Sequence, residues 1–263
     1  RHMENSAIGA AVRLLVDARS NHERIEMLPP ECRPNSIEEA YVVQDSLIDR
    51  LAASVNGWKV GASNAKAQQN LQTSEPFAGR MLKETTQESP ATLAKGSLFA
   101  PGVEVELAFQ LSKDLPAGDS YSREQIIDAV DRLYPAVEVV DSRYTSGLKA
   151  GIPQIIADNG AHGALILGSA VEHWESVDRL NSAVTLEVNG KKLSSGISSN
   201  ATGGDPLDSV IWLANDRARR GNGLKAGDLI STGSCCTELG WPKPGDQVRA
   251  EFSGIGSVEV QFS

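Results

Sequence analysis

Long apolar runs are missing from this sequence of 263 residues. Charge or glycine interrupts each apolar stretch well before the roughly 20 residues that a membrane-spanning helix needs. The chain does not open with the basic and then apolar segments of a secretory signal, and we interpret Arg1, His2 and Met3 as the remnant of an expression tag. We therefore expect a cytoplasmic protein and do not consider His2 a ligand candidate.

Cysteine is also scarce, with three residues in the whole chain. Cys235 and Cys236 are adjacent and Cys32 is remote from both, so the sequence offers neither a disulfide framework nor a CxxC metal motif. This usage is typical of a reducing compartment and predicts structural roles for the thiols.

Positive charge is in deficit, because the formal net charge is −9. An acidic surface repels nucleic acids and anionic membranes, so we expect neither as a partner. A small acidic substrate is still compatible with this charge, because a bound dication and one or two lysines reverse the local field inside a pocket.

Helical patterns occupy the start of the chain. Apolar residues recur at helical spacing over residues 10–18, and a proline-rich break follows. Ser36, with Glu39 three positions later, forms a capping-box pattern that predicts a helix over residues 37–55. We expect residues 1–56 to form a small helical N-terminal part.

Strand-like patterns dominate residues 57–263. Two further helices are expected over residues 122–133 and 206–220, and Asn189–Lys192 (NGKK) is typical of a hairpin turn. We therefore expect an α/β (α+β) protein with a β-rich catalytic domain over residues 57–263. The expected strands cover residues 57–63, 102–111, 136–141, 163–167, 184–188, 228–232, 248–252 and 257–262.

Two glutamates interrupt the apolar run PGVEVELAFQL. Because side chains alternate along a strand, Glu104 and Glu106 point to one face, and Val103, Val105 and Leu107 point to the other. Neighbouring carboxylates repel each other, and burying them is costly without a shared counter-charge. A divalent cation supplies that charge, and hard oxygen ligands favour Mg²⁺ or Mn²⁺.

Glu138 is the third metal ligand that we predict, because it is the lone acid inside a second apolar run, PAVEVV. Asp141 follows it but lies off the same face, which makes it a weaker candidate. The alternation around Glu104 and Glu106 is also typical of an exposed amphipathic strand without a metal. A second acidic intrusion of the same kind favours the metal site.

Other polar residues are candidates for catalysis or substrate binding. Lys59 in GWKVG suits carboxylate binding or proton transfer once desolvation lowers its pKa, with an exposed strand face as the alternative. His162 is the histidine nearest the expected chemistry, which makes it a candidate catalytic residue. The glycine-rich segments ADNGAHG and STGS suit oxyanion binding, although each is also typical of an ordinary turn. They supply the candidate substrate-binding residues Asn159, Thr232 and Ser234.

Six segments resemble, in order, the 2-keto-4-pentenoate hydratase family within the fumarylacetoacetate hydrolase superfamily. The resemblance extends from about Ser36 to the C-terminus, and six motifs in this order are far more specific than any one of them. The segments are EAYVVQ (39–44), GWKVGAS (57–63), GVEVELAF (102–109), AVEVVDSRY (136–144), ADNGAHG (157–163) and LKAGDLISTGS (224–234).

This resemblance implies a fold, a cofactor and a reaction. It implies a small N-terminal α/β part on a mixed β-sandwich or barrel-like body, in a protein that forms homo-oligomers. It assigns Mg²⁺ or Mn²⁺ to Glu104, Glu106 and Glu138, and a role in proton transfer to Lys59. The implied reaction is hydration of a 2-hydroxy-2,4-dienoate in aromatic catabolism. Decarboxylation of a 4-oxalocrotonate-like acid and C–C hydrolysis of an acylpyruvate are the alternatives.

The chain departs from the family pattern in a segment where PDFGY is usual. EPFAGRM places Phe77 at the position of the acid and Arg80 at that of the tyrosine. We hypothesise that Glu75 replaces the acid in catalysis and that Arg80 binds a distal carboxylate of the substrate. A later loop has Ala161 and His162 where a serine is usual. These losses also raise the alternative of a catalytically silent paralogue that binds an active partner.

Overall fold

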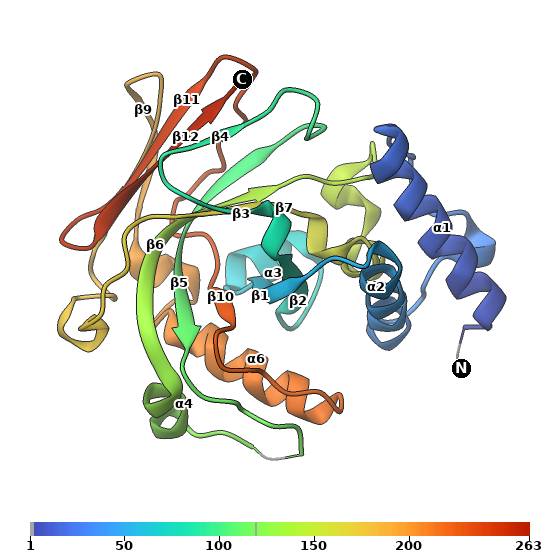
Figure 1. Cartoon of the computed structure of the whole chain (residues 1–263), viewed down its shortest axis with the longest axis horizontal. Helices are drawn as coiled ribbons and strands as arrows, with labels where there is room; N and C mark the ends of the chain where they lie inside the picture. The colour runs from blue at the N-terminus through green and yellow to red at the C-terminus, as the bar shows by residue number, and fades with distance from the viewer. Residues whose placement is uncertain (1–2, 119) are drawn as a thin grey trace.

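Two mixed β-sheets form the centre of the computed structural model, which describes residues 3–118 and 120–263 (Figure 1). The first sheet consists of β1 (Val55–Gly61), β2 (Phe77–Leu82), β3 (Thr86–Glu88), β5 (Gly102–Leu111), β6 (Val130–Val140), β7 (His162–Leu167) and β10 (Leu229–Ser231). The second sheet consists of β4 (Ala91–Leu93), β8 (Ala183–Val188), β9 (Lys191–Ile197), β11 (Gln247–Phe252) and β12 (Gly256–Phe262). The strand orders within the described residues are β2-β1-β10-β5-β6-β7-β3 and β4-β12-β11-β8-β9.

The first sheet curls on itself like an incomplete barrel. Asn56 on β1 donates a hydrogen bond from Nδ2 to Oγ1 of Thr86 on β3 at 3.1 Å, although the two strands lie near opposite edges of the sheet. The outer face of β5 packs on the second sheet through Val103, Val105 and Leu107, all fully buried. The prediction of a mixed sandwich or barrel-like body is therefore confirmed.

The inner face of the curled sheet has a polar end and an apolar end. Glu104 and Glu106 lie on it near the end where β5 begins, while the opposite end is filled by apolar side chains. These side chains pack against each other and leave the polar end as the place for chemistry. The apolar cluster consists of Met81, Ala108, Ala136, Leu165, Leu167 and Leu229.

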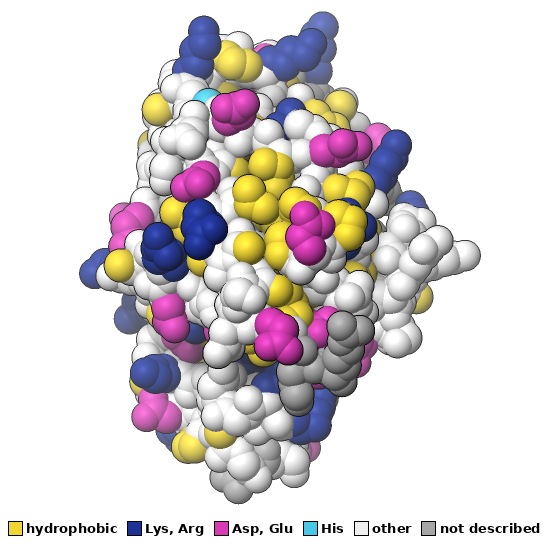
Figure 2. All heavy atoms as spheres, turned by 90° about the vertical axis from the view of Figure 1, so that its right-hand side faces the viewer, with side chains coloured by type: hydrophobic (Ala, Val, Ile, Leu, Met, Phe, Trp, Pro, Cys, Tyr) yellow, Lys and Arg dark blue, Asp and Glu magenta, His cyan; other side chains and the backbone are white. Residues whose placement is uncertain are grey.

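Helices cover the sheets on two sides, with α1 and α2 at the right of Figure 1 and α6 below. Figure 2 shows apolar side chains gathered within a charged surround on the face that carries α1 and α2. Within the described part of the chain, no helix has the length and apolar character that crossing a membrane requires. The helices are α1 (Asn5–Asn21), α2 (Ile37–Leu51), α3 (Ala65–Leu71), α4 (Arg123–Ala129), α5 (Ile152–Ala157) and α6 (Leu207–Arg219).

The start of α2 follows the prediction, but its end does not. Ser36 Oγ accepts a hydrogen bond from the Glu39 amide at 3.1 Å, as an N-cap should. In a standard capping box the Glu39 carboxylate would accept from the amide of Ser36, but here it accepts from the Asn35 amide at 2.8 Å. The helix ends at Leu51 because Ala52 adopts a left-handed conformation with φ of 52°, before β1 begins.

The helix predicted over residues 122–133 is too long. Its capping box at Ser122 and Gln125 is confirmed, but α4 ends at Ala129 and the chain continues into β6. Leu133 pairs with Phe109 on β5, so long-range strand pairing overrides the local helical pattern here. The hairpin prediction is confirmed, since Asn189 and Gly190 have φ of 52° and 79° between β8 and β9.

Candidate active site

The three predicted ligands converge at one point on the inner face of the first sheet. Glu104 lies directly opposite Glu138 in the antiparallel register of β5 and β6, and Glu106 follows on the same face of β5. One carboxylate oxygen from each residue lies within 4.8 Å of the others. Glu106 and Glu138 are buried while Glu104 is partly exposed, so the site opens beside Glu104.

The protonation of these acids reflects their burial. Burial and the charge of Glu138 raise the pKa of Glu104 to about 7. Burial and the charges of Glu138 and Glu104 raise the pKa of Glu106 well above its usual range. Burial also opposes ionisation of Glu138, but Lys59 and His162 outweigh it and lower the pKa of this carboxyl. The metal-free site therefore carries fewer negative charges than its three carboxyls suggest.

A divalent cation fits this donor set. Glu138 Oε2 accepts from both Lys59 and His162, whereas its Oε1 is buried and has no hydrogen-bond partner among the described residues. A buried carboxylate oxygen without a partner is costly, and a cation beside Glu104 and Glu106 removes that cost. Oxygen donors of this kind suit hard dications.

Lys59 joins the site from β1. Its Nζ lies 3.0 Å from Glu138 Oε2 and donates to the carbonyl oxygen of Gly160 at 2.8 Å. Burial by itself lowers the pKa of this ammonium, but the nearby glutamates outweigh it, and the pKa is raised. The expectation that desolvation lowers this pKa is therefore wrong for the metal-free protein, because the glutamates are so close.

His162 is buried at the start of β7, with Nδ1 2.9 Å from Glu138 Oε2. Burial lowers the pKa of its imidazole, which favours the neutral form. Because ionised Glu138 can only accept, Nδ1 carries the proton and Nε2 is the acceptor. Nε2 has no partner among the residues that the structure describes.

Ser231 is a site residue that the sequence analysis missed. It lies on β10 opposite Lys59 on β1, and its hydroxyl donates to Oε2 of Glu106. The peptide N–H of Gly233 donates to the same carboxyl. Ser231 is the polar residue that ends the apolar strand LIS, and it lies on the same face as Lys59. This pattern identifies Ser231 as a site residue only when the register of β1 and β10 is known.

Two predicted substrate-binding residues have their polar atoms committed elsewhere. Asn159 accepts from the Arg80 amide at 2.7 Å and donates to the Arg80 carbonyl at 2.9 Å, so it fastens β2. Thr232 Oγ1 donates to the Leu107 carbonyl at 2.7 Å and is fully buried. The side chains of both residues therefore bond to backbone groups of neighbouring strands. This use of their polar atoms counts against direct substrate binding. Ser234 remains a predicted substrate-binding residue, because its buried hydroxyl has no partner among the described residues.

Arg80 is turned away from the glutamates, and Glu75 makes no hydrogen bond to them among the described residues. Arg80 pairs with Trp58 on the face of the sheet opposite Lys59, and its guanidinium stacks 4.0 Å from the Trp58 ring. The hypothesis that Arg80 binds the substrate within this site is wrong in geometry, because strand alternation turns it away. For Glu75, no hydrogen bond or ion pair of the side chain occurs among the described residues, and its catalytic role stays a prediction.

Comparison with known proteins places this geometry in a family. Residues 52–263 match the model of the fumarylacetoacetate (FAA) hydrolase C-terminal domain. The chain belongs to this family.

A 2-keto-4-pentenoate hydratase of Paraburkholderia xenovorans is 31% identical over 230 residues, covering 86% of this chain and 84% of that protein. A 2-hydroxyhexa-2,4-dienoate hydratase of Comamonas testosteroni is 31% identical over 233 residues, with 87% of each chain covered. The structure of 4-oxalocrotonate decarboxylase from Pseudomonas putida G7, complexed with magnesium and adipate, has a TM-score of 0.92 at 26% identity and covers 100% of both chains.

These likenesses confirm the predicted resemblance, the fold class and the prediction of an enzyme. The magnesium-bound relative and the cluster of carboxylates together support a divalent metal cofactor. The individual roles of Lys59, His162 and Ser234 stay predictions.

Proposed function

We propose that the protein is a divalent-metal-dependent hydratase that adds water to a 2-hydroxy-2,4-dienoate or its 2-oxo-4-enoate form. The observation that carries this proposal is the buried cluster of Glu104, Glu106 and Glu138, with Lys59 at 3.0 Å from Glu138. Hydratases acting on such dienoates are among its relatives.

The chain's residues would bind the metal and move the proton. Glu104, Glu106 and Glu138 would hold Mg²⁺ or Mn²⁺, which when bound supplies a Lewis acid beside the 2-oxygen and carboxylate of the substrate. Lys59 Nζ, oriented by the Gly160 carbonyl, is placed to hold and deliver a proton. His162 acts on Glu138 rather than on substrate, because its proton already points to that carboxylate.

Decarboxylation is the second candidate, and the position of Phe77 favours it. The Phe77 ring lies 5.7 Å from Lys59 Nζ, at the position where the family pattern has an acid. An aromatic ring cannot activate water, whereas vinylogous decarboxylation needs no water activated there. A 4-oxalocrotonate decarboxylase is also the relative with the TM-score of 0.92.

A substrate panel with added Mg²⁺ tests the proposal. Loss of the ultraviolet absorbance of 2-hydroxypenta-2,4-dienoate, with formation of 4-hydroxy-2-oxopentanoate, is the expected result. Release of CO₂ from 4-oxalocrotonate with no hydration product would favour the second candidate. Pyruvate release from an acylpyruvate would instead indicate the C–C hydrolase alternative, and no turnover of any substrate would favour a catalytically silent paralogue.

We further propose a small 2-oxo or 2-hydroxy acid as substrate, a homo-oligomer and a cytoplasmic location. The apolar patch on the face of α1 and α2 supports an association of subunits, because exposed apolar patches mark interaction sites (Figure 2). Light scattering of the purified protein measures the assembly directly, and a mass of one chain would contradict it.

A further inference from the structure

The end of the barrel at which the site opens carries two aromatic rings, each lying on a glycine. The first is Phe77, which pairs with Gly61 on the face of Lys59. A Cβ at Gly61 would lie 2.3 Å from the Phe77 ring, so glycine is required for the ring to lie there. Phe77 is buried and gives the wall beside Lys59 an apolar surface.

The second ring is Trp241. A Cβ at Gly102 would lie 2.8 Å from Trp241 Cζ3 and 3.0 Å from Val140 Cγ2. Gly102 pairs with Val140, as Glu104 pairs with Glu138, so this contact is on the face of the metal ligands. The indole therefore lies one repeat of the strand beyond Glu104, at the open side of the site.

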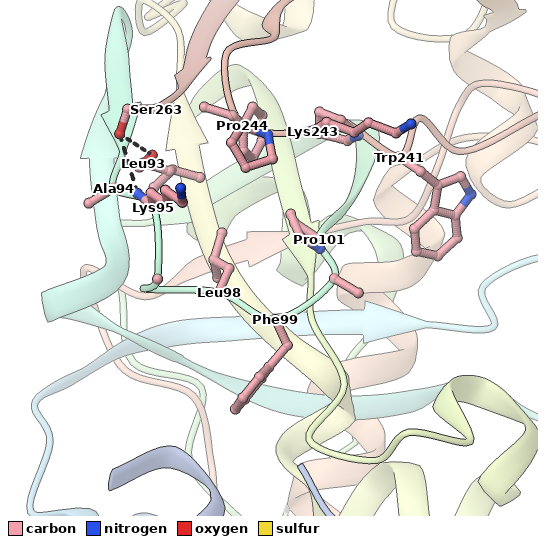
Figure 3. Close-up of a pocket in the computed structure, with 14 residues that line it drawn as sticks. Leu93, Ala94, Lys95, Leu98, Phe99, Pro101, Trp241, Lys243, Pro244 and Ser263 are labelled. Atoms are coloured by element: carbon pink, nitrogen blue, oxygen red, sulfur yellow. Dashed lines mark hydrogen bonds between the residues drawn. The ribbon is translucent and has the colours of Figure 1, made fainter. Parts of the chain in front are cut away.

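Trp241 is unusually exposed for its position, with 60% of its surface accessible. It also lines a groove of ≈ 320 Å³, together with Pro101, Leu93 and Pro244 (Figure 3). In Figure 3 the indole projects from the segment 241–244 beside Pro101. An exposed indole at the mouth of a polar site is available to a ligand that leaves the glutamates in this direction.

We infer that Phe77 and Trp241 determine specificity by holding an apolar alkyl or aryl group at the distal end of the substrate. This inference rests on the proposed function, because it takes the acid end of the substrate to lie at Glu104, Glu106 and Glu138. Two residues of a strand advance by about 6.8 Å, which is comparable with the length of a five-carbon chain. A substrate held at Glu104 therefore reaches Trp241 with the carbons beyond its fifth.

The acid that the family pattern places at Phe77 would disfavour such a tail, and its replacement by a ring favours it. The groove beyond Trp241 also contains Lys95 and Lys243. A tail ending in a carboxylate is therefore the competing occupant, and the experiment includes it.

Calorimetry with unreactive 2-oxo acids tests the inference without turnover. The Mg²⁺-loaded protein is titrated with 2-oxobutanoate, with 2-oxooctanoate and with 2-oxooctanedioate. We expect 2-oxooctanoate to bind about tenfold more tightly than 2-oxobutanoate, since it buries additional methylenes. Trp241→Ala should lose most of this gain and Trp241→Phe should keep part of it. Leu148→Ala, which removes another exposed apolar side chain, should keep all of it.

Three results would overturn the inference: no gain from the longer chain in the wild-type protein, a full gain in Trp241→Ala, or tighter binding of the dicarboxylic acid. If 2-oxobutanoate binds and the tail adds nothing, the subsite alone is disproved. If no 2-oxo acid binds the Mg²⁺-loaded protein, the proposed function fails as well.

Discussion

His162 Nδ1 lies 2.9 Å from Glu138 Oε2, and both side chains are buried. This contact, with that of Lys59, occupies one oxygen of Glu138 and leaves the other, Oε1, without a partner among the described residues. Hydrogen bonds to a ligating carboxylate fix its orientation and are as much a part of a metal site as the ligands. We therefore propose that His162 positions Glu138.

Replacement of His162 by two amides tests this positioning. Asparagine carries its nitrogen near the position of Nδ1 and can still donate to Glu138, whereas glutamine carries it near Nε2. We expect His162→Gln to weaken Mn²⁺ binding by about 10–100-fold and His162→Asn to restore most of the affinity. Calorimetric titration of the metal-stripped variants measures both. Equal affinities in the two variants would show that the hydrogen bond does not matter.

Lys59→Met removes the proposed proton carrier while keeping most of the side-chain volume. We expect kcat to fall by about 10²–10⁴-fold, because general acid–base catalysis contributes on this scale. Mn²⁺ should still bind, since the three glutamates remain. Steady-state kinetics at saturating substrate and metal titration separate the two effects. A variant that keeps wild-type kcat would exclude Lys59 from proton transfer.

Metal binding should weaken as the pH falls below 7. The pKa of Glu104 is raised to about 7 in the metal-free protein by burial and by Glu138. Below this pH the carboxyl of Glu104 is protonated and the metal must displace its proton, so this residue alone lowers the apparent affinity by about tenfold per pH unit, and the raised pKa of Glu106 adds to the slope. Mn²⁺ titrations at pH 6, 7 and 8 measure the slope. Glu104→Gln should bind more weakly and show a shallower pH dependence; an unchanged slope would contradict this assignment.

Arg80 should contribute to stability rather than to substrate binding. Its guanidinium stacks on Trp58, and such a contact contributes about 1 kcal/mol. We expect Arg80→Met to lower the free energy of unfolding by about this amount in urea and to leave KM unchanged. A tenfold rise in KM at unchanged stability would instead revive the hypothesis of a distal carboxylate contact.

The strand that carries Glu104 and Glu106, two of the predicted metal ligands, was predictable because its signal is local. β5 has the predicted bounds of residues 102–111, and strand alternation alone places Glu104 and Glu106 on one face. The contact between Glu138 and Glu104 depends on the register of two strands far apart in the chain, which no local pattern reveals.

The same limit explains the errors. Val130 to Leu133 follow a capped helix and share its apolar spacing, but pairing with β5 makes them strand. Arg80 and Thr232 lie in segments next to the site. Strand alternation turns Arg80 away from it, and the hydroxyl of Thr232 donates its hydrogen bond to the backbone carbonyl of Leu107. Ser231 was missed because its partner Glu106 lies 125 residues away.

Metal titration of the stripped protein tests whether Glu104, Glu106 and Glu138 bind a divalent cation. Mn²⁺ is titrated by calorimetry into the wild-type chain, into Glu106→Gln and into Glu124→Gln, which alters an exposed acid on α4. We predict one Mn²⁺ per chain in the wild type and in Glu124→Gln, and binding weakened by at least about tenfold in Glu106→Gln. Absence of binding by the wild-type chain, or equal affinity in Glu106→Gln, would contradict it.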